Sequence, residues 1–337
     1  MMISNQQAAP LLSVIIPAYN VADCIERTLD NVLQQTWKNL ELIVVDDGST
    51  DHSGAILDRY AAAHGGKIRV IHTPNHGVTS ARLTGVRQAA GEWIGFVDGD
   101  DLLDPDMYEL LIGNALRFHA DISHCGYRME FEDGRIHYFH DSGVLLEHDR
   151  REGLEQLLTG TLVEPGLCNK LYSRKLFDRF FEQNRMDLSI KQTEDLLMNF
   201  LLFDCAERSV FQDVCKYRYM VRTGSATRTA LNDAIVYDPL RVRKLILDYA
   251  SGDIREVAQS TYIDSCLNSY NSLTVSRDTR YRHLLPTLRT EIIRNWEWVK
   301  RLGRKRWLLA VLLRVSPAVH KLIYSIYVVH FQEKEYE

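Results

Sequence analysis

Short runs of β-branched and other apolar residues alternate with segments of helical periodicity in the first part of the chain. The runs that we predict as strands are Leu12 to Ile16, Leu40 to Val45, Ile68 to Ile71 and Trp93 to Val97. Between them, apolar residues recur at helical spacing from Ile25 to Leu33, from Ile56 to Tyr60 and from Ala81 to Ala89. This alternating order is typical of a parallel sheet covered by helices.

The pattern changes twice further along the chain. A helix is predicted from about Pro105 to Phe118, and the alternation from Asp121 to His140 predicts a β-hairpin. Residues 147–205 are predicted to be mostly helical, and Val210 to Val221 to form another strand. Beyond about residue 230 we expect helices only, ending in a basic and apolar segment.

Composition and charge exclude several classes of protein. The 337 residues are 45% hydrophobic and 25% charged, as in ordinary globular proteins. The formal charge of −5 gives no basic excess for neutralising phosphates, so we expect no nucleic-acid partner. We find no secretory signal and no apolar run long enough to span a membrane, and we expect a cytoplasmic location. The six cysteines include no C-x-x-C pair.

Polar clusters follow three of the predicted strands, at residues 17–20, 46–51 and 98–101. Ligands of open parallel sheets bind beyond the carboxyl ends of the strands, so these clusters are candidate binding loops. Asp98, Asp100 and Asp101 would repel one another without a cation, and a few hard oxygen ligands suit Mg²⁺ or Mn²⁺ held jointly with substrate phosphates. Alternatively, Asp101 or Asp104 caps the next helix, and both interpretations can hold.

Four motifs in order resemble family 2 glycosyltransferases of the GT-A fold. They are Leu12-Ser-Val-Ile-Ile-Pro-Ala-Tyr-Asn20, Val44-Val-Asp-Asp-Gly-Ser-Thr-Asp51, Asn75-x-Gly77 with Ala81-Arg82, and Phe96-Val-Asp-Gly-Asp-Asp101. The match is close over residues 11–110 and looser to about 228. It implies a Rossmann-like mixed α/β sheet flanked by helices in a catalytic domain, 11–228, with a nucleotide-sugar half, 11–104, and an acceptor half, 105–228. A helical C-terminal region, 229–337, would follow.

The resemblance assigns roles to individual residues. Asp98 and Asp100 would bind the metal, and Asp46 or Asp47 would accept a hydrogen bond from a uracil N–H. The donor-binding residues that it implies are Pro17, Tyr19, Asn20, Asp46, Asp47, Asn75, Arg82, Asp98, Gly99, Asp101, Arg222 and Ser225. Turn formation before Gly48 is the alternative role for the two aspartates. Leu83 stands where the family often has Asn, which removes one polar contact.

Inversion by direct displacement needs a carboxylate that takes the proton of the attacking hydroxyl. The resemblance makes Asp195 this base, in Thr193-Glu194-Asp195 at a predicted helix start, with Glu194 as the next candidate. Without the resemblance, a favourable interaction with the helix dipole would be enough to explain two acids at a helix start. Arg222 and Ser225 belong to a segment that could close over the donor, and Lys170 resembles an acceptor-side residue.

The sequence therefore predicts a metal-dependent, inverting transferase. It would move a hexose or N-acetylhexosamine from a UDP-sugar to a hydroxyl of a glycan acceptor, which we expect to be lipid-linked and destined for surface polysaccharide. The alternative is a catalytically silent nucleotide- or glycan-binding subunit of a glycosyltransferase complex. A processive synthase would need membrane helices, and a nucleotidyltransferase would need a glycine-rich basic first loop.

The C-terminal segment opposes the overall negative charge. From Arg289 to Lys321 there are nine basic residues and two acidic ones, interspersed with tryptophans and leucines. Such a segment can lie in a membrane interface, so we expect residues 289–331 to hold the protein on the anionic inner face of the cytoplasmic membrane. Packing against the catalytic domain or a second subunit is the alternative. The oligomeric state is left open.

Overall fold

The computed structural model describes residues 9–222 and 231–327 of the chain. The chain divides into two compact units. The first comprises Met1–Lys191 and Met198–Thr229, and the second comprises Gln192–Leu197 and Ala230–Glu337. The strands of the first unit are β1 Leu12–Ala18, β2 Leu40–Asp46, β3 Ile68–His72, β4 Trp93–Phe96, β5 Leu102–Leu103, β6 Ile122–Phe131, β7 Ile136–Tyr138, β8 Leu145–Asp149, β9 Lys170–Ser173 and β10 Arg208–Val221. Its helices are α1 Ile25–Leu33, α2 Ser53–Ala63, α3 Val78–Gln88, α4 Met107–Phe118, α5 Arg150–Thr159, α6 Arg174–Gln183 and, from residue 198 on, α7 Glu194–Cys205.

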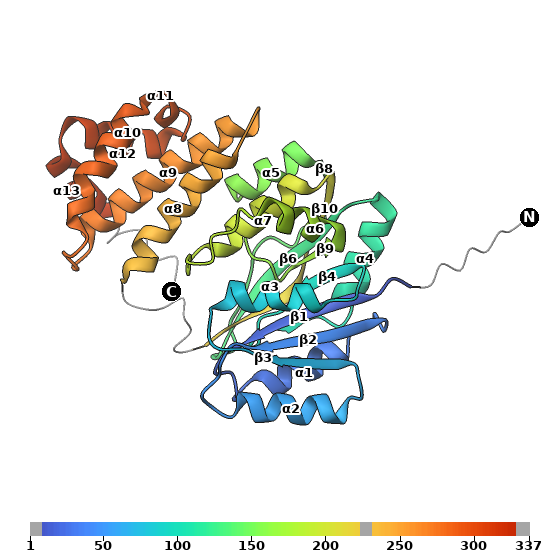
Figure 1. The fold of residues 1–337 in the computed structure, drawn as a ribbon. Coiled ribbons are helices and arrows are strands. Elements are labelled where there is room, and N and C mark those ends of the chain that lie inside the picture. The colour runs from blue at the N-terminus through green and yellow to red at the C-terminus, as the bar shows by residue number, and fades with distance from the viewer. Residues whose placement is uncertain (1–8, 223–230, 328–337) are drawn as a thin grey trace, which may run out of the picture. The chain divides into compact units, whose positions relative to one another are not determined.

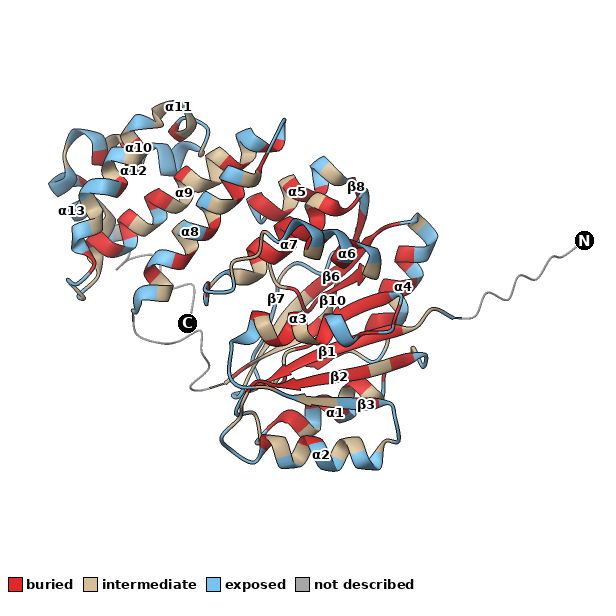
Figure 2. Cartoon of the chain, viewed as in Figure 1, coloured by how far each residue is buried: buried red, intermediate tan, exposed pale blue. Residues whose placement is uncertain are grey.

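The parallel core of the sheet has the order β3-β2-β1-β4. Helices α1 and α2 cover one face of these strands and α3 covers the other (Figure 1). All seven residues of β1 are buried (Figure 2), because helices cover both faces and leave no side open to water. The four strands and three helices predicted for this region are confirmed.

The sheet continues through β9, β6, β10 and β5. Strand β9 is antiparallel to both β4 and β6, and β6 is parallel to β10. The predicted hairpin is confirmed by the pairing of β6 with β7. Strand β9, however, lies in the stretch that we expected to be mostly helical. Its four residues are too few to show a period of their own, and they are extended because β4 and β6 pair with them on both sides.

The second unit contains the helices that follow residue 230. They are α8 Asp233–Tyr249, α9 Ile254–Val275, α10 Leu285–Arg294, α11 Trp296–Val299, α12 Arg304–Val315 and α13 Pro317–Tyr327, with a short 3₁₀ turn at Arg282–Leu284. The long helix α9 runs through their common core, where Ile263, Leu267 and Tyr270 are buried. Among the described helices, none combines the length and hydropathy that crossing a bilayer requires. The predicted C-terminal helical region is confirmed.

The carboxylate of Asp101 fixes the loop after β4 to β10. It accepts a hydrogen bond from the Tyr217 hydroxyl at 2.6 Å and another from the Met220 amide at 2.9 Å. Asp101 is 1% exposed, and burial together with the charges of Asp98 and Asp100 raises the pKa of its carboxyl well above the ordinary value. This connection holds the end of β10 beside the acidic loop.

We predict that Tyr217→Phe lowers the free energy of unfolding by about 1–3 kcal/mol, because Asp101 then keeps a buried oxygen without its donor. Urea unfolding followed by circular dichroism measures the change. Tyr138→Phe is the matched control, since Tyr138 is exposed on β7 and should unfold as the wild type does. Equal stability of both variants would contradict the role of this contact.

Candidate functional site

Three polar loops follow β1, β2 and β4 at one edge of the sheet. The parallel register pairs Ala18 with Asp46 and Ile15 with Phe96, so these strands end close together. The Asp47 amide also donates to the Ala18 carbonyl at 2.8 Å. The three clusters singled out in the sequence therefore belong to one site.

Side chains join the first two loops. Asn20 lies at φ 52° and its carboxamide oxygen accepts from the Thr50 amide at 2.8 Å, while the Asn20 amide donates to Ser49 Oγ at 3.0 Å. Pro17 is buried at the end of β1, whereas Tyr19 is 49% exposed. The loop is thus held in one conformation with an aromatic ring available to a ligand.

Asp47 shapes the loop after β3. Its two carboxylate oxygens accept from the amides of His76 at 2.9 Å and Gly77 at 2.7 Å. Gly48 allows this approach, since it lies at φ 74° and an added Cβ would come within 2.7 Å of the Asn75 amide. The structure therefore places exposed Asn75 directly beside the aspartate pair.

Asp46 is held by a histidine that the sequence analysis did not single out. Its oxygens contact the Ser49 amide at 3.0 Å and His72 Nδ1 at 2.8 Å, and His72 Nε2 contacts Asp58 at 3.0 Å. Burial opposes ionisation of Asp46, but the hydrogen bonds from Ser49 and His72 outweigh it and lower its pKa. Hydrogen bonds to Asp58 and Asp46 raise the pKa of His72. His72 directly follows the third predicted strand, and this position was the signal by which the sequence could have identified it as a site residue.

Each exposed carboxylate of the acidic loop after β4 contacts an arginine. Asp98 pairs with Arg82 of α3 at 2.8 Å, and Asp100 pairs with Arg222 just beyond β10. The side chains of Asp98 and Asp100 are 35% and 32% exposed, whereas that of Arg82 is 4% exposed. The negative charge of the loop is therefore balanced within the protein.

The backbone of the acidic loop is fixed by α1. Thr28 donates its hydroxyl to the carbonyls of Gly99 at 3.1 Å and Asp101 at 3.0 Å. A Cβ added to Gly99 would lie 3.2 Å from the Pro17 carbonyl, so this position favours glycine. The sequence analysis missed Thr28, because nothing in a helical pattern indicates which loop a side chain meets.

A cation at this loop would need ligands from elsewhere. Among the described residues, no group of three histidine, cysteine, aspartate or glutamate side chains could hold a metal ion. The carboxylates of Asp98 and Asp100, each about one-third exposed, fit a Mg²⁺ or Mn²⁺ ion that would take its other ligands from a diphosphate and water.

The remaining predicted residues lie elsewhere in the chain. Glu194 and Asp195 form the first turn of α7 in the segment Gln192–Leu197 of the second unit, directly after Thr193 at φ 60°. Lys170 of β9 is fully buried, and its Nζ donates to the carbonyls of Glu164 at 2.7 Å and Gly166 at 2.6 Å. Ser225 lies outside the described residues. Their assigned roles stay predictions.

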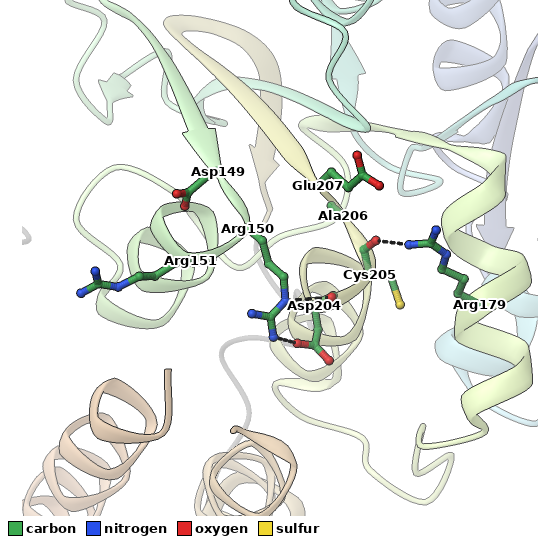
Figure 3. Close-up of a pocket in the computed structure, with 8 residues that line it drawn as sticks. All are labelled: Asp149, Arg150, Arg151, Arg179, Asp204, Cys205, Ala206 and Glu207. Atoms are coloured by element: carbon green, nitrogen blue, oxygen red, sulfur yellow. Dashed lines mark hydrogen bonds and ion pairs between the residues drawn. The ribbon is translucent and has the colours of Figure 1, made fainter. Parts of the chain in front are cut away.

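A pocket lies away from these loops, between the starts of α5 and β10, the end of α7 and helix α6 (Figure 3). It measures about 470 Å³ and is lined by Asp149, Arg150, Arg151, Arg179, Asp204, Cys205, Ala206 and Glu207. Arg150 pairs with Asp204, and Arg179 donates to the Cys205 carbonyl at 3.0 Å. The pocket contains three arginines and three acids and lies near the beginning of β10, so it lacks the position beyond the carboxyl ends of the strands that a donor site requires.

Comparison with known sequences identifies the family. The profile described as Glycosyl transferase family 2 matches residues 13–181. The uncharacterised glycosyltransferase EpsJ of Bacillus subtilis (strain 168) is 35% identical over 229 residues, which cover 67% of this chain and 65% of EpsJ. Glycosyltransferase GlyA of Streptococcus pneumoniae serotype 4 is 32% identical over 64% of this chain and 31% of GlyA. The chain thus spans just under two thirds of EpsJ and under one third of GlyA.

Comparison with solved structures identifies the fold. Residues 1–349 of S. aureus TarS superpose with a TM-score of 0.70 at 19% identity, covering 94% of this chain and 90% of that one. The same TarS segment in complex with UDP-GlcNAc gives a TM-score of 0.66 at 18% identity, covering 94% and 91%. This likeness confirms the GT-A type of fold. Together with the matched profile and the four strand-end motifs, it means that the chain belongs to glycosyltransferase family 2.

Proposed function

We propose that this glycosyltransferase moves a hexose or N-acetylhexosamine, with inversion, from a UDP-sugar to a hydroxyl of a lipid-linked glycan acceptor in surface polysaccharide synthesis. The observation that carries the proposal is the meeting of three loops at one sheet edge, where Asp98 and Asp100 are balanced by Arg82 and Arg222. The UDP-GlcNAc complex of the structurally similar TarS supports a UDP-sugar as the donor.

The uridine would bind against Tyr19 and the aspartate pair. A carboxylate oxygen has two lone pairs, so Asp46 or Asp47 can accept from the uracil N–H in addition to its internal donors. Asp46 stays anionic at neutral pH, because the hydrogen bonds from Ser49 and His72 lower its pKa despite burial. Tyr19 offers an exposed ring on which the base can stack.

The diphosphate would bind at the acidic loop. Asp98 and Asp100 would hold Mg²⁺ or Mn²⁺, which neutralises the charge that develops on the leaving diphosphate. Arg82 and Arg222 now contact these same carboxylates. A bound cation would take over both carboxylates, so that each guanidinium could turn to a phosphate oxygen.

Asp195 is the proposed base. It would take the proton of the acceptor hydroxyl while that oxygen bonds to the anomeric carbon and the bond to UDP breaks, which inverts the centre in one displacement. It lies in the first turn of α7, beside Glu194. Thr193, held at φ 60° just before it, is the kind of strained backbone that clusters at functional sites.

The alternative, a silent nucleotide- or glycan-binding subunit, keeps the donor site but predicts no turnover. The presence of Asp98, Asp100 and Asp195 favours the enzyme. Release of UDP from a panel of UDP-sugars, with and without Mn²⁺, separates the two functions.

We also propose that residues 289–331 hold the protein on the anionic inner face of the cytoplasmic membrane; 328–331 lie outside the described residues. On α13, Val319, Leu322, Ile323 and Ile326 are exposed at helical spacing and form one apolar stripe. The nine basic residues between Arg289 and Lys321 complement a negatively charged lipid surface. A peripheral position beside lipid-linked acceptors would follow.

Asp100→Asn should abolish the Mn²⁺ dependence of UDP binding, because one anionic ligand becomes neutral. Without divalent ions its affinity for UDP should equal or exceed that of the wild type, since Arg222 loses its carboxylate partner. Isothermal titration calorimetry measures both. Asp106→Asn, which removes the carboxylate that pairs with Lys216 outside the acidic loop, should behave as wild type. Retained Mn²⁺ dependence in Asp100→Asn would exclude this ligand.

Asp195→Asn should keep its affinity for UDP but slow sugar transfer on the order of 10²- to 10⁴-fold, the usual contribution of a positioned base. The matched variant Glu194→Gln removes a charge from the same helical turn and should keep most of the rate. Quenched-flow measurement of single-turnover transfer compares them. A larger loss in Glu194→Gln would move the base to Glu194, and near wild-type rates in both would leave only the helix-dipole role.

Leu322→Glu should weaken sedimentation with vesicles of phosphatidylcholine and phosphatidylglycerol, because it puts a negative charge into the exposed stripe. Leu322 is 63% exposed, so folding should tolerate the change. Leu116→Glu, at a site 50% exposed on α4, is the control and should sediment as wild type does. Equal binding by the two variants would remove the membrane role from α13.

A further inference from the structure

The carboxylate of Glu164 is partly buried and has no partner among the described residues. Glu164 lies in the loop between α5 and β9, where no N–H or O–H group donates to its side chain and no cation forms an ion pair with it. Burial raises the pKa of this carboxyl, although the charges of Lys170 and His140 oppose the rise. Carboxylates that lose contact with water are normally paired, so an unpaired one points to a ligand.

Buried polar groups fix the backbone of this loop. Lys170 of β9 is fully buried, and its Nζ donates to the carbonyls of Glu164 at 2.7 Å and Gly166 at 2.6 Å. Asn199 of α7 is also fully buried, and its carboxamide nitrogen donates to the Pro165 carbonyl at 2.5 Å. Burying an ammonium group is costly unless hydrogen bonds satisfy it. The loop is therefore held through its backbone, which leaves the carboxylate of Glu164 free for another contact.

An unpaired tyrosine hydroxyl lies near Glu164. Tyr127 of β6 stacks on Phe139 with the ring centroids 4.6 Å apart. The hydroxyl of Tyr127 has no hydrogen-bond partner in the part of the chain that the structure describes. Burial and the charge of Glu164 raise the pKa of Tyr127, so the two side chains are close enough to interact. A carboxylate that accepts and a hydroxyl that donates or accepts together suit a ligand rich in hydroxyl groups.

Tyr127 also lies close to the acidic loop after β4. Strand β6 runs parallel to β4, because β9 is antiparallel to both, and its carboxyl end therefore lies at the edge of the three polar loops. In the register of β6 with β10, Tyr127 pairs with Tyr217. The Tyr217 hydroxyl accepts from the Asp98 amide at 3.4 Å and donates to Asp101 at 2.6 Å. Neighbouring strands are about 5 Å apart, so Tyr127 is one strand away from the residue that supports the acidic loop.

We propose that Glu164 and the hydroxyl of Tyr127 form a subsite for an uncharged sugar ring of the glycan acceptor, next to the diphosphate of the donor. This role rests on the proposed function, because it concerns the acceptor of the same transfer. The carboxylate of Glu164 would accept hydrogen bonds from hydroxyls of the ring, and Tyr127 would meet a further one. The same carboxylate repels a sugar that is itself an anion, so the subsite selects neutral sugars over uronic acids.

Matched pairs of methyl glycosides test this selectivity. Methyl β-D-glucopyranoside and methyl β-D-galactopyranoside are the neutral sugars, and the corresponding glucuronide and galacturonide carry a carboxylate at C6. Saturation-transfer-difference NMR titrations of the full chain, with UDP and Mg²⁺ present, give a dissociation constant for each. We expect the wild type to bind a neutral glycoside more tightly than its charged counterpart. Equal affinities, tighter binding of the charged sugars or no binding of any of them would overturn the proposal.

Glu164→Gln keeps the shape of the side chain and removes its charge. We expect the variant to bind the neutral glycoside about tenfold more weakly, because hydrogen bonds to a charged group are lost, and to bind the uronide no more weakly than the wild type does. Tyr127→Phe should weaken the binding of both sugars by a similar factor. Glu182→Gln, at an exposed position on α6, loses the same charge and should bind as the wild type does. Equal weakening of both sugars by Glu164→Gln would reduce its role to a structural one and overturn the proposal.

Calorimetry with UDP and Mg²⁺ separates this subsite from the donor site, and thermal unfolding verifies that each variant is folded. Every variant should keep the wild-type affinity for UDP. Failure of the wild type to bind UDP would overturn the proposed donor, whatever the glycosides do. If UDP binds but the glycosides do not distinguish Glu164→Gln from Glu182→Gln, only the acceptor subsite is overturned. Loss of UDP affinity in Glu164→Gln would move this carboxylate to the donor site and exclude its acceptor role.

Discussion

The electrostatic balance of the acidic loop after β4 is the constraint on which the rest of the site depends. Three aspartates within four residues cannot remain together in a packed protein unless opposite charge or hydrogen-bond donors meet them. Asp98 pairs with Arg82 and Asp100 pairs with Arg222, while Asp101 accepts a hydrogen bond from Tyr217. These partners come from α3, from β10 and from the residue just after β10, so the loop connects segments far apart in the sequence.

This balance also explains how one loop can be both stable and ready for a ligand. Asp101 is buried and takes part in the architecture, whereas Asp98 and Asp100 remain about one-third exposed beside their arginines. An ion pair that is partly exposed is weak enough to exchange partners. A cation bound with a diphosphate could therefore replace the arginines without disturbing the buried aspartate that holds β10.

The parallel half of the sheet was predictable and the other half only in part. Mainly apolar runs such as Leu40 to Val45 indicate strands buried on both faces, and they formed as expected. Strand β9 was missed because its four residues become extended by pairing with β4 and β6. Similarly, nothing local identified His72 as the partner of Asp46 or Thr28 as the support of the acidic loop, since both contacts join distant segments.

The sequence by itself determined the family, the order in which the parallel strands and helices follow one another along the chain, and the three polar loops at the strand ends. Each of these depends on local spacing, which a single chain displays directly. Only the tertiary structure decided which arginine meets which aspartate, that Asp101 is buried, and that Lys170 is enclosed by backbone carbonyls. Those outcomes depend on the burial and charge of residues that folding brings together. Because these residues are far apart along the chain, no local sequence pattern indicates that they will meet.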